Sequence, residues 1–476
     1  MLFNSYSFIF LFVPVVWLGF RLFSSYRLLS VALVWLTISS FCFYAYWNPP
    51  FVFLLLFSII FNFGIGKALN RENVYRQYFL FFGITVNLLW IAYFKYGNFL
   101  MSNVYALALS HWVNRDIFLP LGISFFTFQQ IAFLIEIYKG EITNPSLLNY
   151  SLFVSFFPQL IAGPIVRYTE IVPYFYQKRT FVVDYKNIAL GLFLFSIGLA
   201  KKVVIADSLS PWVAEVFDKT GPLHFWSAWS GALAYTFQIY FDFSGYSDMA
   251  LGLGNLFNIS LPINFNSPYK ALSITDFWRR WHITLSSFLR DYLYIPLGGN
   301  RKGKLSQYKN LLVTMTLGGL WHGASWTFVF WGFYHGLLLL GHKVLSAFLK
   351  RHNLSKNPRF LKWVATFFPV TLGWVFFRSH SLAQTYTIIK AMVGFQGIPS
   401  LNVSLLRGMH FPELVLCLFI CLFMPQSWEM ISFHGTSGNT GRRSLSKMKI
   451  AVAAFVFLLA VILIGTKPTE FLYFQF

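Results

Sequence analysis

Hydrophobic residues recur along this 476-residue chain in long runs that are separated by short polar connections. A helix of about 20 apolar residues crosses the hydrocarbon core of a bilayer. Runs near that length predict spans near residues 5–20, 29–47, 51–66, 78–96, 117–137, 149–166, 187–206, 228–241, 309–333, 335–349, 361–377, 411–425 and 450–465. Several are short or contain glycine and proline, as at Gly163-Pro164 and Gly318-Gly319. Broken helices are tolerated at membrane depth where protein or a water-filled cavity surrounds them. The pattern therefore predicts an all-α integral membrane protein with roughly 10 to 13 crossings, re-entrant helices and a central cavity.

Composition supports a membrane protein. The chain is 57% hydrophobic and 11% charged, whereas soluble domains contain about 25% charged residues. Aromatic residues reach 21%, as expected for helices flanked by interfacial belts of Tyr and Trp. Because apolar runs extend from end to end, we expect one polytopic domain over residues 1–476, with its histidine-bearing region at about 228–340. The first run lacks a preceding positive side chain and a small-residue cleavage site, so we expect it to remain as a span.

The net charge of +21 reflects topology. Basic residues cluster in short connections, including Arg21 and Arg27, 67–76, 301–309 and 442–449, rather than on a surface suited to nucleic acid. The positive-inside rule places these connections in the cytoplasm and both chain termini outside, with the C-terminal 471–476 on the external face. Attraction to anionic lipid or to an anionic cofactor is a secondary possibility for the same charges.

Three cysteines, Cys42, Cys417 and Cys421, lie in apolar runs. Their spacing is not that of metal ligands, and Cys417 and Cys421 lie one helical turn apart. We expect Cys417 and Cys421 to be core residues, and for the three cysteines we expect no disulfide, no thiol catalysis and no bound metal.

Two histidines lie beside tryptophans in apolar segments, His282 after Trp281 and His322 after Trp321. Burial disfavours the charged imidazole, so each is a candidate general base. Ionisable groups within a membrane are costly and are functional candidates. The alternative is a pair of core histidines that are hydrogen-bonded to backbone carbonyls.

The segment from Ser273 to Tyr294 predicts an amphipathic helix capped by Ser273 or Thr275. Its apolar stripe lies opposite a face carrying Arg279, His282, Ser286 and Arg290. The charges within 279–291 disfavour a lipid-exposed span, so we expect an interfacial or protein-buried helix that carries His282 inward. A purely structural collar helix is the alternative.

Two carboxylates, Asp242 and Asp248, occur in another polar cluster within an apolar region. Carboxylates within a membrane usually pair with an opposite charge. We therefore expect them to pair with Arg279, Arg280 or Arg290 and favour this role over proton transfer.

Several long motifs resemble the membrane-bound O-acyltransferase family, specifically its bacterial branch of alginate O-acetylation membrane subunits. The resemblance extends over essentially the whole chain. The matching motifs are Leu119 to Phe126, Phe157 to Pro164, Tyr240 to Ala250, Phe277 to His282, Arg290 to Ile295, Gly318 to Gly323 and the C-terminal Phe471 to Phe476.

The resemblance implies a ring of helices around a thinned centre through which a tunnel joins the two faces. It identifies His322 of the Trp-His-Gly motif as the principal catalytic residue and His282 as the second. The imidazole would take the proton of a hydroxyl that attacks a thioester carbonyl, while His282 orients the acyl group or polarises its carbonyl. Acetyl-CoA is the expected donor. Further residues are expected at the substrate site, namely Trp321, Trp281, Asp242 and Ser325.

Relatives in this family act on alginate, cellulose, peptidoglycan or, by D-alanyl transfer, teichoic acid, and the sequence does not identify the acceptor. Its motifs favour acetyl over D-alanyl transfer. The resemblance also implies a bacterial inner membrane location and a separate periplasmic SGNH-type acetyltransferase partner, because no Gly-Asp-Ser nucleophile motif occurs here. A transporter would also show broken helices with polar residues, although no inverted repeat is evident. A scaffold of a secretion complex is the third possibility.

Overall fold

The computed structural model of this protein describes residues 1–71, 74–219, 221–352, 358–400, 408–434, 442–466 and 472. The helices group into two compact units. Unit 1 comprises Met1–Ala200, Tyr246–Pro262 and Ile431–Ile464, and unit 2 comprises Lys201–Gly245, Ile263–Met430 and Gly465–Phe476. The single domain expected from the sequence stays a prediction. The external location expected for 471–476 concerns residues that, apart from Leu472, lie outside the described part of the chain.

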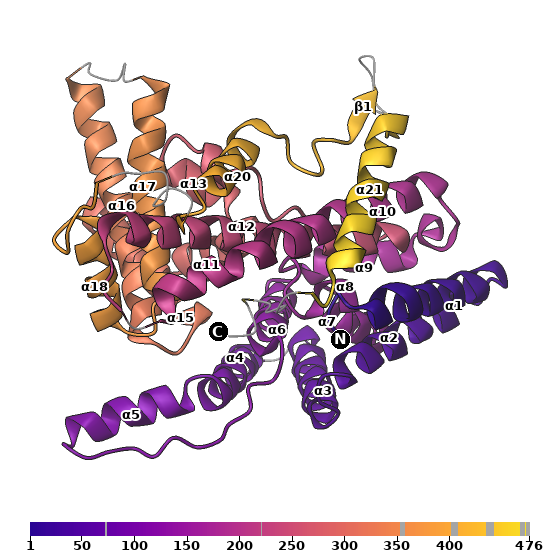
Figure 1. Ribbon diagram of the computed structural model, residues 1–476. Coiled ribbons are helices and arrows are strands. Elements are labelled where there is room, and N and C mark those ends of the chain that lie inside the picture. Colours follow the sequence, from indigo (N-terminus) through magenta and orange to yellow (C-terminus); the bar gives the residue numbers. More distant parts are fainter. Residues whose placement is uncertain are drawn as a thin grey trace. The chain divides into compact units, whose positions relative to one another are not determined.

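Unit 1 contains the N-terminal helices (Figure 1). Its elements are η1 (Phe8–Phe12), α1 (Val13–Ser25), α2 (Leu29–Ala45), α3 (Pro50–Asn70), α4 (Arg76–Phe94), α5 (Gly97–Leu107), α6 (Ile123–Tyr138), α7 (Leu147–Ser155), α8 (Phe157–Leu160), α9 (Tyr168–Tyr176), η2 (Lys178–Phe181), α10 (Tyr185–Ala200) and α21 (Lys447–Leu463), with a short antiparallel pair β1 (Ser432–His434) and β2 (Arg442–Ser444). Helix α1 packs on α2. Both α3 and α4 pack on α6, and α21 packs on α10.

Polar side chains join three of these helices. Ser58 on α3 donates to the Gln130 side chain on α6 at 2.7 Å. The amide of Asn87 on α4 donates to that of Asn62 on α3 at 2.6 Å. Because lipid tails provide no hydrophobic drive for helices to associate, interhelical hydrogen bonds of this kind help to hold membrane helices together.

Arg21 is not in a connection, as the sequence analysis had placed it. It lies inside α1, is 7% exposed, and donates to the backbone oxygens of Leu256 at 2.8 Å and Val182 at 2.9 Å. A buried guanidinium carries N–H donors that need acceptors, and backbone carbonyls at the end of α12 and just after η2 accept from its two terminal nitrogens. Arg21 is therefore a structural residue, and its charge carries little information about topology.

Unit 2 contains the segments that carry the candidate chemistry. Its elements are η3 (Lys201–Ala206), α11 (Asp207–Phe217), the first part of α12 (Phe225–Leu256), η4 (Pro268–Lys270), α13 (Ile274–Arg280), α14 (Ile283–Leu289), η5 (Arg290–Tyr294), α15 (Gly303–His322), α16 (Trp326–Arg351), α17 (Arg359–Arg378), α18 (Leu382–Met392) and α20 (Phe411–Phe423). Helix α16 packs against both α15 and α17.

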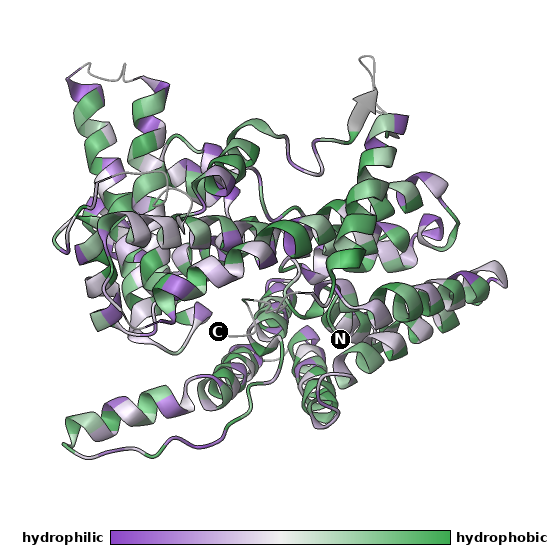
Figure 2. Ribbon diagram, in the orientation of Figure 1, coloured by the Kyte–Doolittle hydropathy of each residue, from purple (hydrophilic) through white to green (hydrophobic). Residues whose placement is uncertain are grey.

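Among the described residues, six helices are long and apolar enough to cross a membrane. They are Phe8–Ser25, Pro50–Asn70, Arg76–Phe94, Tyr185–Phe217, Trp326–Arg351 and Arg359–Arg378, and Figure 2 shows hydrophobic residues along their lengths. Shorter apolar helices occur at Leu29–Ala45, Ile123–Tyr138 and Phe411–Phe423. The protein is thus an all-helical polytopic membrane protein apart from the one short strand pair, and the expected total of crossings stays a prediction.

Two glycines set the close crossing of α15 and α16. A Cβ added at Gly319 would lie 2.2 Å from the carbonyl oxygen of Phe328, and one at Gly332 would lie 2.3 Å from that of Met315. These distances are too short for any side chain, so the two backbones can approach only because both positions are glycine. The crossing fixes the end of α15, where His322 lies.

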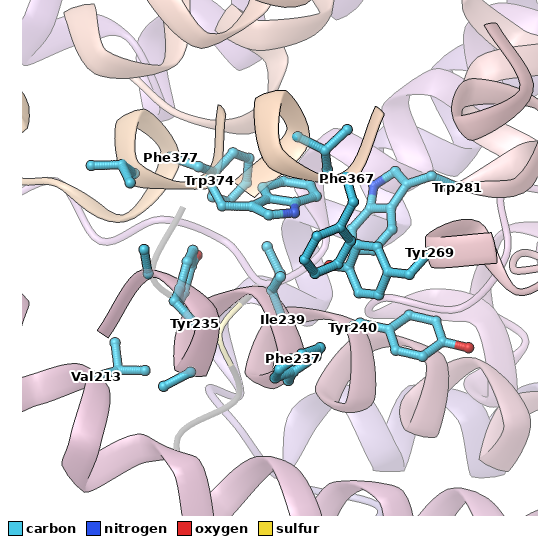
Figure 3. Close-up of a cluster of buried hydrophobic side chains, with 14 of the residues drawn as sticks. Val213, Tyr235, Phe237, Ile239, Tyr240, Tyr269, Trp281, Phe367, Trp374 and Phe377 are labelled. Carbon is cyan, nitrogen blue, oxygen red and sulfur yellow. The ribbon is translucent and has the colours of Figure 1, made fainter. Parts of the chain in front are cut away.

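An aromatic core joins α17 to α12 in unit 2 (Figure 3). Trp374 and Phe367 of α17 face Phe237 and Ile239 of α12. Trp281 packs on Trp374 with ring centroids 4.7 Å apart. All five side chains are at most 4% exposed. Aromatic rings contribute large buried areas and favour tilted or edge-to-face contacts, which makes this cluster a rigid support for the neighbouring segment at Trp281–His282.

Candidate active site

His322 is the last residue of α15. The sequence predicted a single span over 309–333, but the helix ends here, because Gly323 is extended and Ser325 caps the next helix by accepting from the Thr327 backbone N–H. The imidazole is 4% exposed, and its ring lies 5.1 Å from those of Trp331 and Phe377. A helix end and an aromatic cage thus fix the position of this side chain.

His282 lies at a break between two short helices. The sequence predicted one helix from Ser273 to Tyr294, but α13 ends at Arg280 and α14 begins at Ile283. His282 between them has a left-handed backbone, with φ 43° and ψ 56°. Such a conformation costs a non-glycine residue on the order of 1–3 kcal/mol and is found where surrounding structure imposes it.

Hydrogen bonds from a distant loop impose this break. The backbone N–H of Ile283 donates to the carbonyl of Asn264 at 3.0 Å, and the N–H of Asn266 donates to that of Arg280 at 2.9 Å. These bonds replace those that a continuous helix would make within itself. The face expected to hold Arg279, His282, Ser286 and Arg290 together therefore does not form. Arg279 is exposed and His282 is fully buried.

The environment of His282 keeps its ring neutral. This residue lies outside the six spanning helices, and burial lowers its pKa from 6.5 to about 3. Its Nδ1 lies 3.1 Å from the side-chain oxygen of Asn264, and Phe243 meets the ring edge-on at 4.7 Å. Burial thus favours the uncharged imidazole expected from the sequence, and the hydrogen-bond partner at Nδ1 is an amide side chain.

The structure brings the two predicted histidines together. Their ring centroids are 6.5 Å apart, and the ring of Trp321 lies 6.1 Å from His282 and 5.0 Å from His322. The two imidazoles and the Trp321 ring therefore form one buried cluster. Trp321 is 6% exposed and belongs to the same cluster.

A cavity of about 190 Å³ borders His322. Its wall on α15 is one helical face, formed by Leu311, Thr314, Met315, Gly318 and His322. Across from this face lie residues of α13 to η5 and of α16, namely Trp278, Leu285, Ser286, Leu289, Arg290, Tyr294, Trp331 and Leu339. With 1.5 Å of rise per residue, the α15 face from Leu311 to His322 is about 16 Å long. The cavity therefore follows α15 toward the imidazole.

Asp242 pairs with a lysine that the sequence analysis did not consider. Lys202 Nζ lies 2.7 Å from a carboxylate oxygen of Asp242 and 2.7 Å from one of Asp207, and all three side chains are at most 4% exposed. The expected arginine partners pair elsewhere, Arg280 with Asp276 at 2.8 Å and Arg290 with Asp291 at 2.6 Å. The expected ion pair is therefore present with a different cation, because η3 places Lys202 against α12.

The other predicted residues are distributed as follows. Trp281 is 1% exposed in the aromatic core, Ser325 is the cap of α16, and neither lines the cavity. Asp248 is buried in unit 1, whereas the three arginines belong to unit 2. The substrate-binding roles of Trp321, Trp281, Asp242 and Ser325 stay predictions. Among the described residues, no group of three His, Cys, Asp or Glu side chains is arranged to hold a metal ion.

Sequence reasoning missed two residues near the site besides Lys202. His335 on α16 is fully buried, and its ring lies 4.9 Å from that of Trp331. The signal was available, because His335 also follows aromatic residues in an apolar run. Asn264 offered no such signal, since its contact with His282 spans 18 residues and depends on the helix break.

Comparison with known proteins identifies the family. A sequence model described as the membrane-bound O-acyltransferase family matches residues 43–383. A peptidoglycan O-acetyltransferase of Helicobacter pylori is 45% identical over 85% of this chain and 82% of its own length. A probable alginate O-acetylase of Pseudomonas aeruginosa is 42% identical over 89% and 81%. A teichoic acid D-alanyltransferase of Streptococcus thermophilus is 28% identical over 50% and 60%. This chain belongs to the membrane-bound O-acyltransferase family and is an acyl-transferring membrane enzyme.

Proposed function

We propose that this protein takes an acetyl group from a cytoplasmic donor and passes it across the bacterial inner membrane for O-acetylation of an extracytoplasmic polysaccharide. The observation that carries this proposal is His322, which borders an apolar cavity and lies 6.5 Å from the ring of His282. The relatives named for O-acetylation of peptidoglycan or alginate are similar over most of the chain. The weaker similarity to a D-alanyltransferase favours acetyl over D-alanyl as the transferred group.

In the proposed reaction, the imidazole of His322 accepts the proton of a hydroxyl group as its oxygen attacks the thioester carbonyl. The carbon–sulfur bond then breaks, and the leaving thiolate takes the proton from the imidazolium. General-base assistance of this kind typically contributes a factor of about 10²–10⁴. The aromatic rings around His322 exclude water, which favours transfer to the hydroxyl over hydrolysis of the thioester.

Acetyl-CoA is the proposed donor. Cavities that enclose whole small ligands usually measure about 300–1,000 Å³, whereas this cavity measures about 190 Å³. It accordingly suits the acetyl group and the slender end of its carrier, with the nucleotide outside. Arg290 and Tyr294 line the cavity and precede the basic segment 301–304, which leads into α15 and offers positive charge to the phosphates.

A periplasmic SGNH-type acetyltransferase is the proposed recipient of the acetyl group. A polymer needs an extended groove, whereas a hydroxyl side chain of a docked partner is small enough to reach a buried imidazole. The proposed orientation places 301–304 in the cytoplasm and the chain termini outside, in accordance with the positive-inside rule.

Reconstitution tests the function and the relay separately. Proteoliposomes with radiolabelled acetyl-CoA inside receive peptidoglycan or alginate outside, with and without the partner transferase. We expect labelled polysaccharide only when the partner is present. Efficient labelling without it would overturn the relay, and no acetyl transfer to any acceptor would overturn the function. Equal results with the His322→Ala variant would favour a transporter or scaffold instead.

A further inference from the structure

The side-chain oxygen of Asn264 is a shared hydrogen-bond acceptor next to the His282 ring. Asn264 is 1% exposed. Its Oδ1 accepts from the backbone N–H of Thr284 at 3.3 Å and from the Thr284 hydroxyl at 3.0 Å. The same oxygen lies 3.1 Å from His282 Nδ1. Three groups from the start of α14 thus converge on one amide oxygen.

The backbone N–H of Thr284 determines which way the amide points. A backbone N–H can only donate, so an oxygen must face it and the NH₂ group cannot. The Nδ2 of Asn264 is buried and has no hydrogen-bond partner among the described residues. An unpaired buried donor is unfavourable. The amide therefore keeps its oxygen toward Thr284 and His282 even though this orientation leaves its NH₂ group unpaired.

This orientation determines the tautomer of His282. Because Asn264 presents an acceptor, Nδ1 must carry the hydrogen, and in the neutral ring the lone pair is then on Nε2. The backbone of Asn264 reinforces the geometry, since its carbonyl accepts the N–H of Ile283 next to the ring. One residue therefore holds both the strained backbone and the imidazole of His282.

We propose that Asn264 is a positioning residue that fixes His282 as the Nδ1–H tautomer, so that His282 enters the reaction as a hydrogen-bond acceptor at Nε2. A neutral ring of this tautomer has no hydrogen on Nε2 to donate to a carbonyl oxygen. His282 consequently does not polarise the acyl carbonyl, the role that its resemblance to the family had suggested. Partners that fix the tautomer of a functional histidine in this way typically contribute about 10–100-fold at metal sites. The catalytic role of His282 rests on the proposed function, whereas its tautomer does not.

Nitrogen NMR of the ¹⁵N-histidine-labelled protein in detergent tests the tautomer without any activity. The His282 signals are identified by their loss in the His282→Asn variant, whose residue type tolerates a left-handed backbone. We expect a protonated Nδ1 and an unprotonated Nε2 in the wild type and in Thr284→Val, which retains the backbone N–H. Asn264→Leu should release the tautomer. Protonation at Nε2 in the wild type would overturn the proposal, whatever the transfer activity.

The pH dependence of transfer separates positioning from a merely structural role. The rings that contact His282 belong to Phe243 on α12 and to Trp321 and His322 on α15, and of these three side chains only His322 carries a titratable imidazole. Asn264→Asp keeps an acceptor oxygen but adds a negative charge, which stabilises imidazolium and raises the pKa of His282. Transfer by this variant should fall at acid pH and recover to within about threefold of wild type at alkaline pH. Asn264→Leu should lose about 10–100-fold in kcat at every pH. Equal, pH-independent losses in both variants would overturn the positioning role.

Discussion

The ring centroids of the His282 and His322 imidazoles lie 6.5 Å apart. His282 lies between α13 and α14, whereas His322 is the last residue of α15. Each ring nitrogen lies close to its own centroid, so even nitrogens that face each other across this separation are too far apart for a direct hydrogen bond. The two rings are therefore neighbours in one buried aromatic cluster and do not hydrogen-bond directly to each other.

His322→Ala should leave a folded, membrane-inserted protein whose acetyl transfer falls by about two to four orders of magnitude, the scale of a lost general base. Adding His282→Asn should reduce the rate by less than the product of the two single effects, because residues acting on one reactant are not additive. Radiolabelled transfer in membranes measures both. His352→Ala, at an exposed histidine, is the matched control. Near-normal transfer by His322→Ala would contradict the assignment.

The crossing of α15 and α16 should be intolerant of a single methyl group. Gly319→Ala or Gly332→Ala places a Cβ within 2.3 Å of a backbone oxygen, and such overpacking typically costs about 1–3 kcal/mol or more. Thermal unfolding in detergent should show the loss, together with reduced transfer as His322 shifts. Gly341→Ala on α16 is the control, since nothing lies within 4 Å of its added Cβ. Equal stability of all three variants would show that the crossing does not require glycine.

Lys202 should matter more to stability than either of its carboxylate partners. Lys202→Met leaves Asp207 and Asp242 buried without their shared cation, and breaking a buried ion pair costs about 3–5 kcal/mol. Asp207→Asn leaves one lysine with one carboxylate, a balanced pair, so its cost should be smaller. Thermal unfolding of the two variants compares them directly. A larger loss for Asp207→Asn would refute this account of the cluster.

The sequence predicted the membrane class and many of the helices, because the spacing of apolar residues is a local signal. It also singled out His282 and His322 as candidates, whereas their joint role came from the family resemblance. Three features depended on long-range contacts and were missed. Loop residue Asn264 breaks the predicted helix at His282, where no glycine or proline announces a break. Lys202 lies in an apolar run, and it was not considered as a partner for Asp242, although a buried carboxylate requires a nearby cation. The chain also ends α15 at His322 rather than continuing through Gly323.

The orientation of unit 2 can be measured by labelling. In a background without Cys42, Cys417 and Cys421, Lys302→Cys should react with a membrane-impermeant reagent only after permeabilisation, because the positive-inside rule places it in the cytoplasm. Helix α17 leads away from the side on which α16 ends, so His380→Cys beyond its end should react in intact cells. The reverse pattern would invert the proposed topology.

His335 provides the last prediction. Its ring is fully buried, both of its nitrogens lack a hydrogen-bond partner among the described residues, and it packs on Trp331. Unpaired buried polar atoms cost about 1–3 kcal/mol, so His335→Phe, which keeps an aromatic ring, should be as stable as the wild type or more stable. Transfer by this variant should stay within about threefold of the wild type, since Trp331 would remain supported beside His322.

The matched variant His335→Ala removes the ring itself. It should lose about 3–5 kcal/mol, the range for emptying a buried aromatic site, and transfer should fall because Trp331 loses its support. Thermal unfolding and labelled acetyl transfer, measured on both variants, distinguish the contribution of ring packing from that of the imidazole nitrogens. A Phe variant that folds normally but no longer transfers acetyl would show that the imidazole nitrogens take part in the reaction, and His335 would then join His282 and His322 as a third functional histidine.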